Sequence, residues 1–443
     1  MKRLLARSAT LLFALVFFIT ATGCQQLLNE IPFPRRTALA TQPEASPQAT
    51  LTHDMQKTEL PAVVEDKLDK IIFWLPPAFD PENGSSAGRR IQERLQAFRY
   101  DHPEVTIEVR VKALSGPGSL LDSLSAATLA APAVVPGLLI LPHADLAIAV
   151  SQGLIVPVEA EQNQANQADH FAFAEDLVRV NGLDYGLPFA ADVFCLAYKN
   201  QQVAYPPVYW QEVIQLGKIL AFPAGEAQGL TTQLLYLEKG GTFTQNETQI
   251  TVDEVPLQQT LMFLAEGANA DVFPYWLTNS NRFEDSWQAV LDAQATYAVV
   301  RASQYLSARP ENIAITSVPS FSEKRLSLAD GWVIAFPASS PEHFELYRQL
   351  AAYLVEPRFQ AEWTESAGLL PVSRTALSLW KNNEVSGILL ELAESARVVP
   401  PAHIISRVGP LFAQATSEMI RQQTTYIESA NKIIKSLAEV PLE

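Results

Sequence analysis

The 443-residue sequence has only two cysteines, Cys24 and Cys195, and six histidines. Two thiols cannot form a disulfide framework or a four-cysteine zinc site. The sequence also lacks the metalloprotease motif H-E-x-x-H and the phosphate-binding motifs G-x-x-x-x-G-K-[ST] and G-x-G-x-x-G. The sequence therefore gives no support for a metal site or a nucleotide cofactor, and we expect neither.

Positive charge is also scarce. The chain has 32 Lys and Arg against 48 Asp and Glu, which gives a net charge of -16. A surface this acidic repels phosphate backbones, so we expect no nucleic-acid partner. The hydrophobic share of 48% is ordinary for a globular protein. The length suits two or three domains.

The first 23 residues have the pattern of an export signal. Three basic residues stand before an apolar run over residues 11–19, and small residues follow as far as Gly23. The run is shorter than the about 20 residues that a membrane-spanning helix needs. Small residues directly before Cys24 resemble the signal of bacterial lipoproteins, in which that cysteine takes a diacylglycerol. A plain secretion signal with an incidental cysteine is the alternative.

Residues 24–68 contain five prolines among Gln, Ala, Thr and Ser and keep no helical or strand period. This composition is typical of a flexible tether, which we expect to connect a lipidated Cys24 to the folded body. Cys195 lies in an apolar stretch and is interpreted as a small buried residue without a disulfide partner.

Residues 70–152 alternate between strand and helix patterns. The predicted elements are strands 70–75, 105–111 and 137–141, alternating with helices 91–98, 120–130 and 144–152. This order predicts an α/β domain with a layered sheet. In such sheets ligands bind beyond the carboxyl ends of the strands, where Trp74 and Asp145 stand.

The rest of the chain contains both kinds of element. We predict strands ending at 198 and over 296–300, 313–318 and 331–336, helices 210–221, 257–266, 345–355, 358–367 and 386–396, and one long helix 413–437. The sequence shows no internal repeat.

Four stretches of this chain carry a resemblance to a known family. They are Phe98–Val111, Leu138–Val158, Asn181–Asn200 and Ala329–Arg374, and the last is the most specific. Together they resemble the extracellular solute-binding proteins (family 1) of bacterial ABC importers, a large group that includes carbohydrate-binding members. The order and spacing of the stretches carry the match, because no single stretch is sufficient.

The resemblance implies an α/β, two-lobed periplasmic-binding-protein-like fold (type II) with a ligand cleft between the lobes. It implies one lobe from residues 69–186 plus 308–355 and a second from residues 187–307 plus 356–443. It also implies a monomer that captures a small polar solute, with carbohydrate as the leading class, and delivers it to ABC permease subunits. Such a protein would be held by its lipid at the extracytoplasmic face of the bacterial cell membrane.

Nine residues are candidates for ligand binding: Trp74, Asp145, Phe189, Asp192, Tyr236, Trp276, Arg301, Ser303 and Trp332. For Asp192 and Trp332 the resemblance implies contact with the ligand. Trp74 is explained equally well as a core residue, and Asp145 as an acid at a helix N-terminus. For Tyr236 and Trp276 packing is the favoured interpretation.

Arg301 departs from the family pattern, which has small residues here. It either donates two hydrogen bonds to a carboxylate, phosphate or vicinal diol or pairs with a nearby acid. Both interpretations remain open from the sequence.

One motif points toward catalysis. Gly84-Ser85-Ser86-Ala87-Gly88 fits the pattern of a hydrolase nucleophile, but no strand leads into the serine. A serine that caps the following helix explains the motif better. We therefore expect a binding module and no enzyme. The alternatives are an exported hydrolase that acts on carbohydrate through two carboxyl groups and a ligand-sensing co-receptor without transport.

Overall fold

The computed structural model describes residues 69–158, 168–246, 249–338, 343–381 and 383–439. All of these residues belong to one compact unit, residues 65–443. The predicted signal peptide, Cys24 and the predicted tether lie outside them. Among the described residues no helix combines the length and the hydropathy needed to cross a bilayer.

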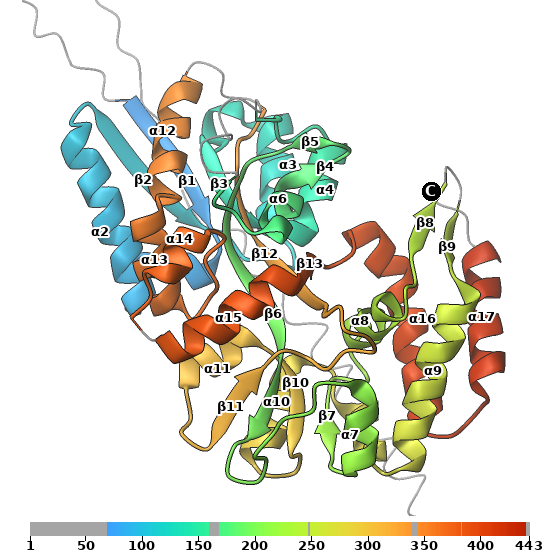
Figure 1. Ribbon diagram of the computed structural model, residues 1–443. Coiled ribbons are helices and arrows are strands. Elements are labelled where there is room, and N and C mark those ends of the chain that lie inside the picture. Colours follow the sequence, from blue (N-terminus) through green and yellow to red (C-terminus); the bar gives the residue numbers. More distant parts are fainter. Residues whose placement is uncertain (1–68, 159–167, 247–248, 339–342, 382, 440–443) are drawn as a thin grey trace, which may run out of the picture. The chain divides into compact units, whose positions relative to one another are not determined.

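The described chain is organised around a nine-stranded mixed sheet with the order β2-β1-β3-β12-β6-β10-β7, in which β11 also pairs with β6 and β13 with β12 (Figure 1). The strands are β1 (Asp69–Leu75), β2 (Val105–Val111), β3 (Leu138–Pro142), β6 (Leu187–Lys199), β7 (Leu220–Ala221), β10 (Tyr297–Arg301), β11 (Ile313–Thr316), β12 (Ser327–Ala335) and β13 (Ala396–Val398). The predicted parallel arrangement holds for β2, β1 and β3. Two short hairpins stand apart from this sheet: β4 (Arg179–Val180) with β5 (Leu183–Asp184), and β8 (Phe243–Gln245) with β9 (Ile250–Val252).

Strand β6 connects two groups of strands. Its first half pairs antiparallel with β12, and its second half pairs antiparallel with β10 and β11. In Figure 1 it runs from the neighbourhood of β12 to that of β10 and β11. The side chains of this 13-residue strand are almost all buried, because both faces are covered, as its continuous apolar sequence requires.

Helices and 3-10 turns connect and cover the strands. They are η1 (Pro77–Phe79), α2 (Ser86–Asp101), α3 (Leu120–Ala130), η2 (Pro132–Val134), α4 (His143–Ser151), α6 (Ala172–Val178), α7 (Trp210–Leu216), α8 (Leu230–Glu238), α9 (Glu254–Asn269), η3 (Tyr275–Asn279), α10 (Phe283–Leu291), α11 (Ala302–Ala308), α12 (Phe344–Leu354), α13 (Pro357–Ala367), α14 (Arg374–Ser378), α15 (Asn383–Ser395), α16 (Ala402–Ile420) and α17 (Tyr426–Glu439). The hydroxyl of Ser85 accepts a hydrogen bond from the Gly88 N–H at 2.9 Å, so this serine caps α2 as predicted.

Two of the predicted helices are wrong in extent. The helix predicted over 210–221 ends at Leu216, because Gly217 takes the left-handed conformation (φ 59°) that commonly ends a helix, and β7 follows. The single helix predicted over 413–437 is two helices, α16 and α17, and Gln422 between them also has a positive φ of 53°. Apolar periodicity continues across both breaks, so spacing alone does not reveal them.

Helix α13 packs against residues from both predicted lobes. Its Trp363 is fully buried, stacks on Phe189 at 4.5 Å between ring centroids and meets Phe79 edge-on at 5.3 Å. Arg90 of α2 also donates to Glu362 of α13 at 2.8 Å. By these contacts α13, which the sequence boundary at residue 356 assigned to the second lobe, packs against Phe189 of the predicted second lobe and against Phe79 and Arg90 of the predicted first lobe.

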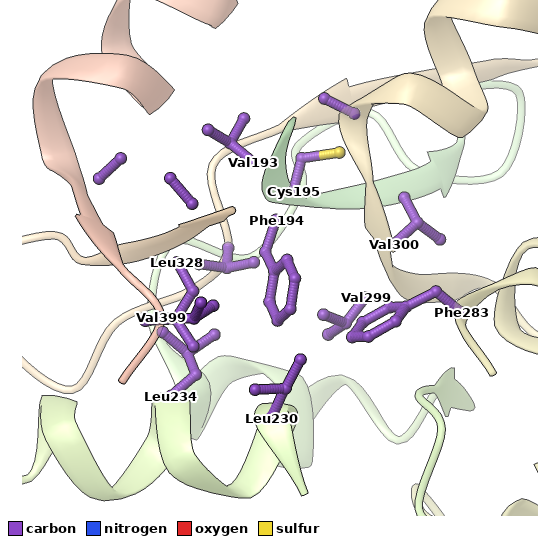
Figure 2. Packing of buried hydrophobic residues seen from close by; sticks show 14 of the residues in the cluster. Val193, Phe194, Cys195, Leu230, Leu234, Phe283, Val299, Val300, Leu328 and Val399 are labelled. Atoms are coloured by element: carbon purple, nitrogen blue, oxygen red, sulfur yellow. The ribbon is translucent and has the colours of Figure 1, made fainter. Parts of the chain in front are cut away.

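A second part of the core lies around the later half of β6. Figure 2 shows the ring of Phe194 among Leu328 and Val399 on one side and Val299 and Phe283 on the other, with Leu230 and Leu234 of α8 beside it. Cys195 is free and buried here, and burial raises the pKa of its thiol well above the usual range. The thiol is therefore an inert core group, as predicted.

Candidate functional site

Asp192 and Ser303, predicted separately, are hydrogen-bonded to each other. Strand β10 pairs Arg301 with Phe194 of β6, and this register brings the first turn of α11 beside Asp192. The Ser303 N–H donates to Asp192 Oδ1 at 3.0 Å, and the Ser303 hydroxyl donates to Oδ2 at 2.5 Å. Asp192 is only 4% exposed, so these bonds replace part of its lost hydration.

Arg301 lies beside an acid that the sequence did not nominate. Its Nη1 is 3.9 Å from Oδ2 of Asp330, while Oδ1 of Asp330 accepts from the Gly331 N–H at 2.8 Å. Its guanidinium carbon is 5.4 Å from the ring centroid of Phe194 and 5.2 Å from that of Phe283. The apolar cluster in Figure 2 therefore also supports this arginine, through cation–π contact with two of its rings.

The pairing of strands brings Asp330 and Asp145 toward Asp192. Asp330 is directly opposite Asp192 in the β12–β6 ladder, and β12 also pairs with the last residue of β3, Pro142. The first turn of α4, which carries Asp145, follows Pro142 at once. We name Asp145, Asp192, Glu226, Arg301, Ser303 and Asp330 the Arg301 cluster.

Burial dominates the titration of these carboxyl groups. Burial and the negative charge of Asp330 raise the pKa of Asp145. Burial also raises the pKa of Asp192, although Arg301 and the bonds from Ser303 oppose the rise.

Glu226 belongs to the cluster through its interaction with Arg301. Burial raises its pKa, while bonds from the N–H groups of Leu230 and Gln228 and the charge of Arg301 oppose the rise. Glu226 Oε1 accepts from Gln228 at 2.9 Å and Oε2 from Leu230 at 3.2 Å. Raised pKa values on several carboxyl groups in one place are typical of functional sites.

Trp332 lies on β12 two residues after Asp330, hence on the same side of the strand. Its side chain is partly buried and meets the ring of Phe79 edge-on at 5.3 Å. Gly331 between them has no room for a side chain, because a Cβ there would lie 2.6 Å from the carbonyl oxygen of Ala190. The sequence Asp-Gly-Trp thus lets β12 lie close to β6 with a partly exposed indole near the Arg301 cluster.

Two other aromatic candidates point into the protein. Phe189 is fully buried and stacks on Trp363. Tyr236 is fully buried as well, donates from its hydroxyl to the Thr242 carbonyl at 2.6 Å and accepts from the Asp253 N–H at 2.7 Å. Burial raises the pKa of Tyr236 to about 12. These contacts favour structural roles for both residues.

Trp74 and Trp276 also pack against the core. Trp74 is 2% exposed, and the ammonium of Lys112 lies 4.7 Å from its ring centroid. Its buried Nε1 has no hydrogen-bond partner among the described residues. Trp276 in η3 is partly buried against the same apolar cluster. Neither is joined to the Arg301 cluster by a described contact.

Sequence reasoning missed Asp330 and Glu226. Asp330 stood in the family-like stretch beside Trp332, so strand alternation was a signal that could have found it. Glu226 follows β7, a two-residue strand that no periodic pattern reveals.

A surface cavity between α2 and β2, about 340 Å³ in volume, is lined by Asp80, Gln92, Arg99 and Val109 among others and by none of the nine candidates. In the residues described, no group of three or more His, Cys, Asp or Glu side chains is arranged to hold a metal ion.

Comparisons with known proteins agree with this arrangement of elements. The chain matches the family of bacterial extracellular solute-binding proteins over residues 93–385. No curated protein matches the chain significantly.

Solved structures of similar fold include two sugar-binding or maltodextrin-binding proteins and a receptor solved with acarbose. A cyclo/maltodextrin-binding protein complexed with maltotetraose has 19% identity and a TM-score of 0.69, with 84% of this chain and 97% of that chain covered. The sugar-binding protein MalE from Xanthomonas citri has 15% identity and a TM-score of 0.68, covering 84% and 96%. The GacH receptor of Streptomyces glaucescens, solved without ligand and with acarbose, has 16% identity and a TM-score of 0.63, covering 84% and 99%.

The fold is the α/β, two-lobed periplasmic-binding-protein-like class (type II), as the family resemblance implied. The chain belongs to the bacterial extracellular solute-binding proteins, because that family covers well over half of its length.

Proposed function

We propose that this protein is the substrate-binding lipoprotein of an ABC import system and that it captures a small polar solute, with carbohydrate as the leading class. The observation that carries the proposal is the Arg301 cluster with Trp332 beside it. Carboxylate acceptors and guanidinium donors orient hydroxyl groups, and an indole face packs on a sugar ring. The solved structures of similar fold were determined with or named for sugars, which supports the same class.

The position of the cluster suggests how binding is coupled to movement. Asp192 and Asp330 stand on β6 and β12, whereas Arg301 and Ser303 stand at the end of β10 and the start of α11. A solute that contacts both groups stabilises the arrangement in which they are close, and this is hinge closure around a cleft. Release without bond breaking then delivers the solute to a membrane permease.

A thermal-shift screen followed by isothermal titration tests the solute class. Maltodextrins, monosaccharides, polyols and polyamines are suitable probes, since micromolar binding corresponds to about 8 kcal/mol and gives a clear shift. The proposal expects stabilisation by a sugar that is recovered unchanged by chromatography. Recovery of a shorter product, lost on substitution of one carboxyl group, would establish the hydrolase instead.

The lipid anchor is a separate proposal that rests on Cys24. Cells that produce the full chain should accumulate the uncleaved precursor when signal peptidase II is inhibited, and Cys24→Ala should move the protein from the membrane to the soluble fraction. Two acyl chains suffice for stable anchoring. Unchanged processing under the inhibitor would contradict lipidation and leave the solute-binding proposal intact.

A further inference from the structure

Arg301 is held in place by its neighbours. Its side chain is only 24% exposed. Its guanidinium carbon lies 5.4 Å from the ring centroid of Phe194 and 5.2 Å from that of Phe283. Its backbone N–H donates to Oε1 of Gln304 at 2.9 Å. These contacts place the guanidinium beside Phe194, Phe283 and Asp330, so its charge acts next to acids of its own chain.

The charge of Arg301 is already shared among carboxyl groups. Asp330 forms the direct ion pair, and Asp192 and Glu226 both interact with the same guanidinium. Asp192 and Asp330 stand directly opposite each other on paired strands, where like charges are destabilising unless a counter-charge is near. Asp145 adds a further negative charge and has no salt bridge among the described residues.

We propose that Arg301 is the internal counterion of this site and thereby sets its specificity, so that the site accepts uncharged or cationic solutes and rejects carboxylates and phosphates. The inference rests on the proposed function, because it assumes that the same residues meet the solute. It chooses between the two interpretations that the sequence left open: Arg301 pairs with acids of its own chain.

The charges and the free donors of the cluster support this choice. Three carboxyl groups, those of Asp330, Asp192 and Glu226, interact with one guanidinium, and Asp145 interacts with Asp330, so an incoming anion meets an excess of acidic groups in a partly buried site where screening is weak. In the described contacts the guanidinium donates no hydrogen bond to the protein. Its N–H groups therefore remain available to neutral hydroxyls, which accept hydrogen bonds without adding charge.

The first arm of the test uses solutes of matched shape. Isothermal titration of the wild-type protein with glucose, glucosamine, glucuronate and inorganic phosphate, and with any sugar that the screen selects, compares neutral, cationic and anionic groups. We expect no binding of glucuronate or phosphate, and at least tenfold tighter binding of the neutral or amino sugar. Tighter binding of either anion would overturn the proposal.

The second arm needs no ligand. Arg301→Gln should lower the melting temperature, and the loss should be greater at pH 8 than at pH 5.5 by about 2–4 °C. Without Arg301 the buried carboxyl groups keep higher pKa values, and a raised acid pKa in the folded state costs stability as pH rises. The titratable groups around this position are Asp145, Asp192, Glu226 and Asp330, with the buried thiol of Cys195.

Three further variants complete this arm. Arg301→Lys keeps the charge and should keep most of the wild-type pH profile, and Asp330→Asn in the Arg301→Gln background should restore part of the loss. Arg358→Gln, at a side chain that is 82% exposed, is the matched control. It should change neither the melting temperature nor its dependence on pH. If Arg301→Gln melts at the same temperature as wild type at both pH values, Arg301 does not neutralise the carboxyl groups of the cluster, and the proposal is overturned. If no sugar binds but this pH signature appears, the carbohydrate assignment fails and the counterion role stands.

Discussion

Two polar clusters of this protein both combine Asp, Glu, Arg and Ser but differ in how completely their charges are paired. The first is the Arg301 cluster. The second, which we name the Asp169 cluster, joins the start of α6 to α14 and α15, and consists of Asp169, His170, Glu175, Ser373, Arg374, Thr375 and Glu394.

In the Asp169 cluster the charged atoms have close partners. Asp169 accepts from the Thr375 N–H at 2.9 Å and from the Thr375 hydroxyl at 2.7 Å, and also from the hydroxyl of Ser373. Arg374 donates to both carboxylate oxygens of Glu394, at 2.8 Å and 3.0 Å. Burial tends to raise the pKa of Asp169, but these hydrogen bonds prevail and lower it.

The Arg301 cluster shows the opposite balance. Its one direct ion pair is long, at 3.9 Å, and burial raises the pKa values of Asp145, Asp192 and Glu226. Stability is best served by complete pairing, as in the Asp169 cluster. Incomplete pairing costs free energy that a bound polar solute can return, which is why we assign binding to the Arg301 cluster and a structural role to the Asp169 cluster.

The largest effect on binding is expected at the two residues that the resemblance singled out. Trp332→Ala and Asp192→Ala should each weaken solute binding by about 1–3 kcal/mol, through loss of aromatic contact and of a carboxylate acceptor respectively. Isothermal titration measures this, with circular dichroism to verify the fold. Tyr205→Ala, at a side chain that is 89% exposed, serves as control. Unchanged affinity in both variants would remove the assignment of the site.

The converse experiment breaks the Asp169 cluster. Asp169→Ala leaves the donors of Thr375 and Ser373 without their acceptor, so it should lower the free energy of unfolding by about 1–3 kcal/mol. Solute affinity should stay within about twofold, which is a small change on a scale where about 1.4 kcal/mol corresponds to tenfold. Urea denaturation and titration give the two values. A loss of affinity without a loss of stability would reverse the roles of the clusters.

The smallest expected effect is a pair of opposite pH dependences. Because the pKa of Asp145 is raised in the fold, its charged form costs stability as pH rises, so Asp145→Asn should gain stability relative to wild type between pH 4 and pH 8, by less than about 1 kcal/mol. The pKa of Asp169 is lowered, so its contribution is present above the unfolded pKa of about 4 and is lost below it. The deficit of Asp169→Asn should therefore shrink in acid. Melting curves from pH 3 to pH 8 give the difference in stability between each variant and wild type. If the distinction between the clusters were false, this difference would change with pH in the same direction for both variants.

The sequence predicted much of the fold, and the structure explains where it stopped. Alternating apolar residues located β2, and continuous apolar runs located β1 and β3, because strands of this length leave a recognisable pattern in the sequence. The two-residue strand β7 and the break between α16 and α17 leave no such period. Spacing along a chain does not report them.

The site was predicted in pieces. Asp192, Ser303 and Arg301 were nominated one by one, but their contacts depend on the register between β6 and β10, which no local pattern contains. Phe189 and Tyr236 carried the right chemistry for a sugar site, yet Phe189 packs on Trp363 of α13, far away in the sequence, and Tyr236 donates to the Thr242 carbonyl, and no local pattern contains these contacts. Composition identifies a residue that is able to bind a ligand, whereas tertiary packing decides whether it is exposed to one.

Hydrogen–deuterium exchange of the full chain, with and without the sugar selected by thermal shift, tests the central claim most directly. We predict slower exchange in peptides that cover residues 142–146, 190–194, 300–304 and 329–333, and no change over residues 168–175 and 373–376. Protection of the second set alone, or of neither set at a sugar concentration that saturates the protein, would contradict the assignment of solute binding to the Arg301 cluster.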